Sequence, residues 1–223
     1  MAESAGRTDP ESSGVVIKLK DYRDAHHYFT AAGKVYDRLN KIYESALDHT
    51  ELYRITADIV KKEFKHIKIS SSPGHVRKHF IGALKSGGFP DYPASPLYAC
   101  QKVYLIHVPA GAGAERMLNV FLDSAVYRGF HAEGYYCPTK PAAKLEHLIV
   151  PGLGIGFVTC ERYQTVPGSA LKAGAEVVTV DLKHIFQDER IRCEEKNLRI
   201  NKKLMDELLE KGLYYLRQAK TGS

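Results

Sequence analysis

The stretch KVYLIHVPAGAGAERMLNVFLDSAVYRGFHAEGYYC, residues 102–137, decides the fold because it combines a strand, a glycine-rich turn, a helix and a second strand. Residues 103–108 are a short apolar run rich in β-branched and aromatic side chains, which favours a buried strand. Residues 109–113 cannot continue it, and residues 115–127 show helical spacing before the stop signal of Arg128 and Gly129. We therefore expect a βαβ unit. The expected buried face of its helix is Met117, Val120, Phe121, Ser124, Ala125 and Tyr127.

A turn of this kind, between a buried strand and a helix, is where P-loop proteins hold phosphate with backbone N–H groups and the positive end of the helix. In the pattern G-x-x-x-x-G-K-[ST], this chain has Val108 at the first glycine, Ala114 at the lysine and Glu115 at the magnesium-binding hydroxyl residue. Without the lysine, no loop cation reaches the β and γ phosphates, and Glu115 repels them unless magnesium intervenes. The candidate nucleotide-binding residues are Pro109, Ala110, Gly111, Ala112, Gly113, Ala114, Glu115 and Arg116.

Two acidic residues follow later strands and are the candidate metal-binding residues. The run GFVTC ends before Glu161, and VVTVD ends in Asp181. An acid at the end of a buried strand is how P-loop enzymes hold magnesium through water. An acidic residue in this position is also an ordinary turn or helix cap, so both interpretations stay open.

Composition limits the class of protein. The chain has 223 residues, a formal charge of +6 and no apolar run near the roughly 20 residues that cross a bilayer. Residues 1–14 are small, polar and acidic, do not resemble a secretory signal and are expected to be disordered. The four cysteines form no C-x-x-C pair, which suits reduced thiols. We expect a cytoplasmic protein with no membrane partner. Acids interrupt the basic residues, so nucleic acid is not the favoured partner.

Helical patterns occupy both ends of the chain. Residues 15–19 are expected to form a strand, and apolar side chains alternate at four- and three-residue spacing from Tyr28 to Ala46. Residues 51–64 continue as the second helix of a hairpin. Residues 201–219 are expected to form an amphipathic helix, and the seam of the first helix packs either against it or against a second copy of the chain. Strands are also expected at 145–150 and 155–160, residues 66–70 fit a strand, and residues 76–84 fit a helix or a strand.

The run VYLIHVPAGAGAERML, followed by LEHLIVPGLG at residues 145–154, resembles a group of bacterial P-loop ATPase-like proteins, often labelled nucleotide kinase, with two tandem copies of one nucleotide-binding domain. The resemblance covers about residues 15–219. It implies that residues 15–64 are the end of a preceding repeat and that residues 65–223 are a P-loop NTPase-like domain. It also implies ATP and Mg²⁺ as ligands. The residues themselves establish no cofactor.

These observations predict an α/β, three-layer P-loop NTPase-like fold with a mainly parallel sheet and long amphipathic helices at both ends. The first functional hypothesis is a module that binds a nucleotide or a partner with weak or absent ATP hydrolysis. Its partner is a second copy of the chain or a preceding repeat. The alternative is an ATPase or a nucleotide or metabolite kinase that uses Arg116 or Lys140 as a displaced cation. The second alternative is a basic protein associated with nucleic acid, whose binding weakens steeply with salt.

Overall fold

The computed structural model describes residues 19–80, 94–137, 139–160, 166 and 170–220. The predicted strand at 15–19 therefore lies almost entirely outside the described residues, and only Leu19, which begins the first helix, is included. The elements in chain order are α1 (Leu19–Ala46), α2 (His49–Phe64), β1 (Val76–Phe80), α3 (Ala94–Tyr98), β2 (Lys102–His107), α4 (Glu115–Val126), β3 (Ala132–Tyr136), β4 (Leu145–Val150), η1 (Pro151–Leu153), β5 (Ile155–Cys160), β6 (Glu176–Asp181), η3 (Lys183–Ile185), α5 (Asp188–Cys193) and α6 (Glu195–Lys220).

The described strands form one mixed sheet in the order β1-β3-β4-β5-β2-β6. Every neighbouring pair is parallel except the two pairs that include β4, so β4 alone runs in the opposite direction. All six residues of β4 and all six of β5 are buried, which accounts for the mostly apolar runs that predicted these strands, although β4 also contains Glu146 and His147. The α/β class and the mainly parallel sheet are thus confirmed.

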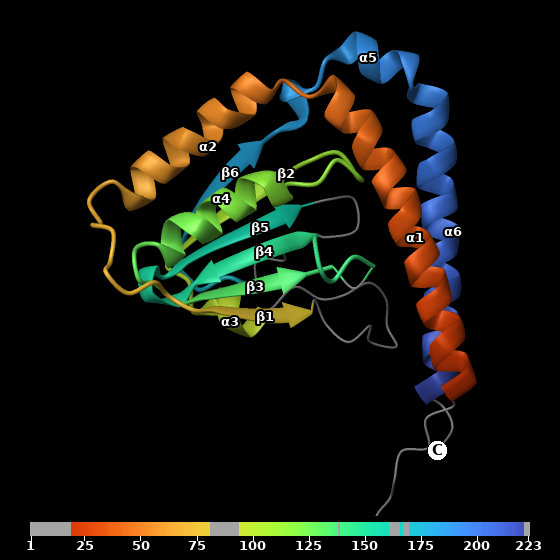
Figure 1. Ribbon diagram of the computed structural model, residues 1–223, viewed down its shortest axis with the longest axis horizontal. Helices are drawn as coiled ribbons and strands as arrows, with labels where there is room; N and C mark the ends of the chain where they lie inside the picture. The colour runs from red at the N-terminus through yellow and green to blue at the C-terminus, as the bar shows by residue number, and fades with distance from the viewer. Residues whose placement is uncertain (1–18, 81–93, 138, 161–165, 167–169, 221–223) are drawn as a thin grey trace, which may run out of the picture.

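The stretch 102–137 folds as predicted, with β2 and β3 joined by α4 (Figure 1). Helix α4 ends where the stop signal placed it, because Gly129 adopts a positive φ of 83° and its N–H donates to the Val126 carbonyl. The predicted buried face of this helix is partly wrong, since Val120 and Tyr127 are exposed. Leu118 and Leu122 are buried instead, because the core-facing stripe lies slightly further round the helix.

The two faces of the sheet have different covers. Buried residues of α2 and α4 pack in one apolar cluster with Tyr104, Ile106 and Phe157 of the sheet. On the opposite face, Leu97 of α3 and Cys100 pack with Val103, Ile149 and Val158. The described residues therefore place the sheet between two layers.

Helices α1 and α6 lie side by side and run antiparallel beside the carboxyl ends of the parallel strands (Figure 1). Tyr28 and Tyr215 stack with ring centroids 5.5 Å apart, and a Cβ at Gly212 would lie 2.5 Å from the Phe29 ring. The seam predicted at residues 28–46 is therefore covered within the chain. Helix α6 begins at Glu195, earlier than the predicted 201, and residues 66–70 form no strand. The ambiguous segment at 76–84 contains strand β1.

Candidate functional site

The segment between β2 and α4 contains the glycine loop, defined here as residues 109–113. Gly111 and Gly113 adopt positive φ angles of 87° and 74°, a region that side chains with a Cβ rarely enter. The Ala112 N–H donates to the Pro109 carbonyl over 2.9 Å, which closes a turn. Helix α4 then begins without a side-chain cap at Ala114. The predicted turn between a strand and a helix is therefore present, and it is not a β-hairpin.

Helix α1 lies directly on this glycine loop. A Cβ at Gly111 would lie 2.9 Å from the Leu39 Cβ, so the two backbones approach as closely as a glycine permits. The Asn40 side-chain amide donates to the Ala112 carbonyl over 2.7 Å. Because Leu39 is fully buried, this contact is part of the core and not a loose surface association.

Tyr36 of α1 reaches the other end of the loop. Its hydroxyl donates to the Glu115 carboxylate, 3.1 Å from Oε1. A Cβ at Gly113 would collide with that hydroxyl and with the Glu115 carboxylate. Tyr36 and Asn40 are four residues apart and therefore project from the same side of the helix. The space beside the loop is thus filled by side chains of α1 and by Glu115.

Both residues predicted as displaced cations are paired with carboxylates of α1. Arg116 forms an ion pair with Glu44, with the two charged atoms 2.5 Å apart. Lys140, in the β3–β4 connection, pairs with Asp37. The sequence analysis identified these two cations as candidates, but it did not predict the carboxylates with which they pair.

A buried ion pair that the sequence analysis missed lies at the start of β4. Lys144 Nζ is 2.9 Å from Glu146 Oε1, and both side chains are about 5% exposed. The register of β3 and β4 shifts between the Tyr135–His147 and Tyr136–Leu145 pairs, so Glu146 occupies a β-bulge. Lys144 Nζ is also 4.0 Å from the centroid of the Tyr36 ring, a favourable cation–π distance. The pattern Lys-x-Glu at the start of an apolar strand was the available signal.

Cys137, which follows β3, and Cys160, which ends β5, are buried and unreactive thiols. Burial raises the pKa of Cys137 to about 12, and the Glu146 carboxylate adds to the shift. Burial likewise raises the pKa of Cys160 to about 11. A thiol with such a pKa is almost entirely protonated near neutral pH, so neither cysteine is a nucleophile. Cys137 and Cys160 are thus free, buried thiols, as the absence of a C-x-x-C pair suggested.

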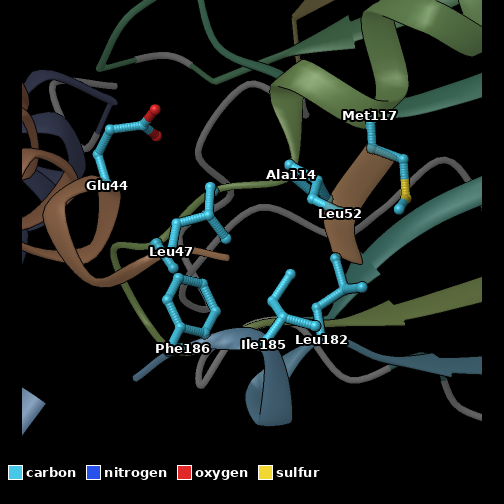
Figure 2. Close-up of a pocket in the computed structure, with 10 residues that line it drawn as sticks. Glu44, Leu47, Leu52, Ala114, Met117, Leu182, Ile185 and Phe186 are labelled. Atoms are coloured by element: carbon cyan, nitrogen blue, oxygen red, sulfur yellow. The ribbon is translucent and has the colours of Figure 1, made fainter. Parts of the chain in front are cut away.

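A small cavity adjoins the loop and the first turn of α4 (Figure 2). Its volume is about 30 Å³, enough for about two water molecules. Most of the described residues that line it are apolar, and Glu44 is the charged residue among them. The lining residues are Glu44, Leu47, Leu52, Ala112, Gly113, Ala114, Met117, Leu182, Ile185 and Phe186. This cavity has no room for a triphosphate with α1 in place.

Of the two metal candidates, Asp181 has a local structural contact. Its Oδ1 accepts the Lys183 N–H over 2.9 Å, so the carboxylate caps the turn that follows β6. Glu161 lies outside the described residues. Within the described ranges, no group of three or more His, Cys, Asp or Glu side chains is arranged to hold a metal ion.

Comparisons of the chain with protein-family models, with curated proteins and with solved structures each found no match. The helices that the structure describes include none with the length and apolar character needed to span a bilayer. Conclusions about function therefore depend on the geometry of the loop and its contacts.

Proposed function

We propose that this protein is a P-loop-like binding module that does not turn over ATP, and that its glycine loop binds a helix in place of a triphosphate. The observation that carries the proposal is the docking of α1 on the loop through Leu39, Asn40 and Tyr36. Support comes from the order of β2, the glycine loop and α4, because phosphate-binding units also place a glycine turn between a strand and a helix. The space where an anion would lie contains protein instead.

The chemistry of the loop supports the absence of turnover. Phosphoryl transfer requires cations that neutralise charge developing on the phosphates. The loop position expected to supply one is Ala114, and the following position places the Glu115 carboxylate beside Gly113. A carboxylate in this position opposes a triphosphate and favours a hydrogen-bond donor such as the Tyr36 hydroxyl.

The docking resembles the helix-in-groove mode by which proteins recognise helical partners. Leu39 supplies the apolar contact, and the Asn40 amide donates a hydrogen bond to a loop carbonyl. Glu44 forms an ion pair with Arg116 beside the loop. In this structure the helix belongs to the same chain. The module thus uses backbone geometry suited to phosphate as a docking surface for a helix.

A paired measurement on the intact chain tests this proposal. ATP with magnesium should neither raise the melting temperature nor release phosphate above the level of a heat-inactivated control. The expected thermal shift is near zero even at millimolar ATP, because binding stabilises only when ligand exceeds its dissociation constant. A clear rise at sub-millimolar ATP, or phosphate release that the control lacks, would contradict the proposal.

A further inference from the structure

Three cations surround the glycine loop, and each contacts a different group of α1. Arg116 of α4 pairs with Glu44, and Lys140 of the β3–β4 connection pairs with Asp37. The third cation, Lys144, faces the ring of Tyr36. An aromatic face carries negative potential, so α1 presents a negative group to every one of these three cations.

Packing alone does not require this match of charges. The buried side chains Tyr36, Leu39 and Tyr43 hold α1 in place through apolar contact. The Asp37 and Glu44 side chains are 48% and 35% exposed, and ion pairs at such positions add little to stability. Two weakly stabilising carboxylates, each opposite a cation beside the loop, indicate a surface that favours anions.

The charge balance of the surface beneath α1 supports this reading. Its three cations exceed the two carboxylates of Glu115 and Glu146 by one positive charge. Adding Asp37 and Glu44 of α1 reverses the sign to one negative charge. The backbone N–H groups at the start of α4, which has no side-chain cap, add further positive potential.

We infer that α1 is a built-in anion mimic, and that the surface around Arg116 and Lys140, next to the buried Lys144, binds a multivalent oxyanion such as pyrophosphate in competition with the Asp37 and Glu44 carboxylates of α1. In this arrangement the carboxylates of Asp37 and Glu44 occupy the positions of oxyanion charges. This goes beyond the proposed function, which requires only that the loop holds a helix.

The test removes the carboxylates of α1 while keeping their shape. The variant Asp37→Asn/Glu44→Gln leaves all three cations in place. It should bind pyrophosphate at least about tenfold more tightly than the unmodified chain in calorimetric titration at low ionic strength, because Arg116 and Lys140 lose their carboxylate partners and attract the anion. Binding should weaken as salt rises, since the partly exposed charges are screened.

A matched control removes the same charge elsewhere. Glu51→Gln/Asp58→Asn neutralises the two carboxylates that pair with Arg54 on α2. This control should gain no affinity. A further variant that adds Arg116→Gln and Lys140→Gln to the first pair should lose the gain. Equal gains in both charge variants, or no gain in Asp37→Asn/Glu44→Gln, would overturn the inference.

Two further arms complete the design. Titrating ATP beside pyrophosphate identifies the source of the anion, because equal affinities assign recognition to phosphate alone and tighter ATP binding adds the nucleoside. If the double variant has a reduced folded fraction, the single variants decide, and each should show a partial gain. ATP hydrolysis by the unmodified chain would contradict the proposed function, whereas absent pyrophosphate binding in the variants would overturn only this inference.

Discussion

Two clusters, each built on a lysine, a tyrosine and one or two glutamates, lie at opposite ends of the parallel strands, and they differ in their access to water. At the amino end of β2, Lys102 is 3.1 Å from both Glu63 and Glu176, and the Tyr104 hydroxyl donates to Glu63. The Lys102 side chain is 20% exposed and that of Glu176 is 54% exposed. The side chains of the Lys144–Glu146 pair, at the start of β4, are only about 5% exposed.

This difference indicates different roles for similar chemistry. The cluster around Lys102 links α2 to the sheet. Water reaches Lys102 and Glu176, and the 8% exposed Glu63 side chain accepts a second hydrogen bond from the Tyr104 hydroxyl. The pair of Lys144 and Glu146 has no comparable access to water, and it lies beneath the helix that covers the glycine loop. Buried pairs are sensitive to the loss of one member, since the remaining charge is left in a medium that solvates it poorly.

The largest expected effect follows from breaking the dry pair. Lys144→Met should lower the free energy of unfolding by about 3–5 kcal/mol, because Glu146 is left as a buried charge. Lys102→Met should cost less, since Glu176 is accessible to water and Glu63 keeps the hydrogen bond from the Tyr104 hydroxyl. Urea unfolding followed by circular dichroism measures both. Equal losses of unfolding free energy would show that the two clusters do not differ in their access to water as described.

A second effect concerns pH and the neighbouring residue of β4. Burial lowers the pKa of His147 to about 4, against an ordinary value near 6.5. The folded state keeps this imidazole neutral, whereas the unfolded chain protonates it below about pH 6.5. Stability should therefore fall by about 3 kcal/mol as pH decreases from 6.5 to 4, and this contribution should level off below that.

The variant His147→Leu isolates that contribution. It should flatten the fall in unfolding free energy between pH 6.5 and 4 relative to the unmodified chain, in urea titrations at matched pH. The exposed residue His66 provides the control, because His66→Leu should leave the slope unchanged. A slope that His147→Leu does not alter would contradict the assignment.

A glycine comparison tests the loop itself. Gly113→Ala should cost about 2–4 kcal/mol, because its φ of 74° strains any side chain and the new Cβ collides with Tyr36 and Glu115. Gly174 also has a positive φ, of 81°, but nothing lies within 4 Å of its Cβ position. Gly174→Ala should therefore cost only about 1–2 kcal/mol. Similar melting temperatures for the two variants would show that α1 does not crowd the loop.

The smallest effect concerns one hydrogen bond. Asn40→Ala removes the donor to the Ala112 carbonyl and should cost about 1 kcal/mol in urea unfolding. Ser45→Ala removes an exposed hydroxyl that donates within α1 and should cost less. If both changes proved neutral, the Asn40–Ala112 hydrogen bond would not contribute to holding α1 on the loop.

The sequence predicted those features that depend on neighbouring residues. The strand, glycine turn and helix of residues 102–137 were predictable because periodicity and turn chemistry act within a few positions. The direction of β4 could not be predicted, because the residues of a strand buried on both faces give the same pattern whichever way the strand runs.

The contacts of α1 were also beyond prediction from the pattern alone. Tyr36 and Leu39 fit a seam between two helices, and nothing in their spacing indicates that they face a glycine loop distant in sequence. The Lys144–Glu146 pair was missed for a related reason. Charges beside a strand ordinarily lie in water, and only the bulge and the cover of α1 bury these two.

The central claim is that α1 packs on the glycine loop, and nuclear Overhauser contacts in solution test it most directly. The account predicts strong cross-peaks between the Gly111 α-protons and the Leu39 methyl groups, because the Leu39 side chain lies against the Gly111 backbone. These cross-peaks should persist in the presence of ATP and magnesium. Sharp, assigned signals for both residues without any cross-peak between them would contradict the account.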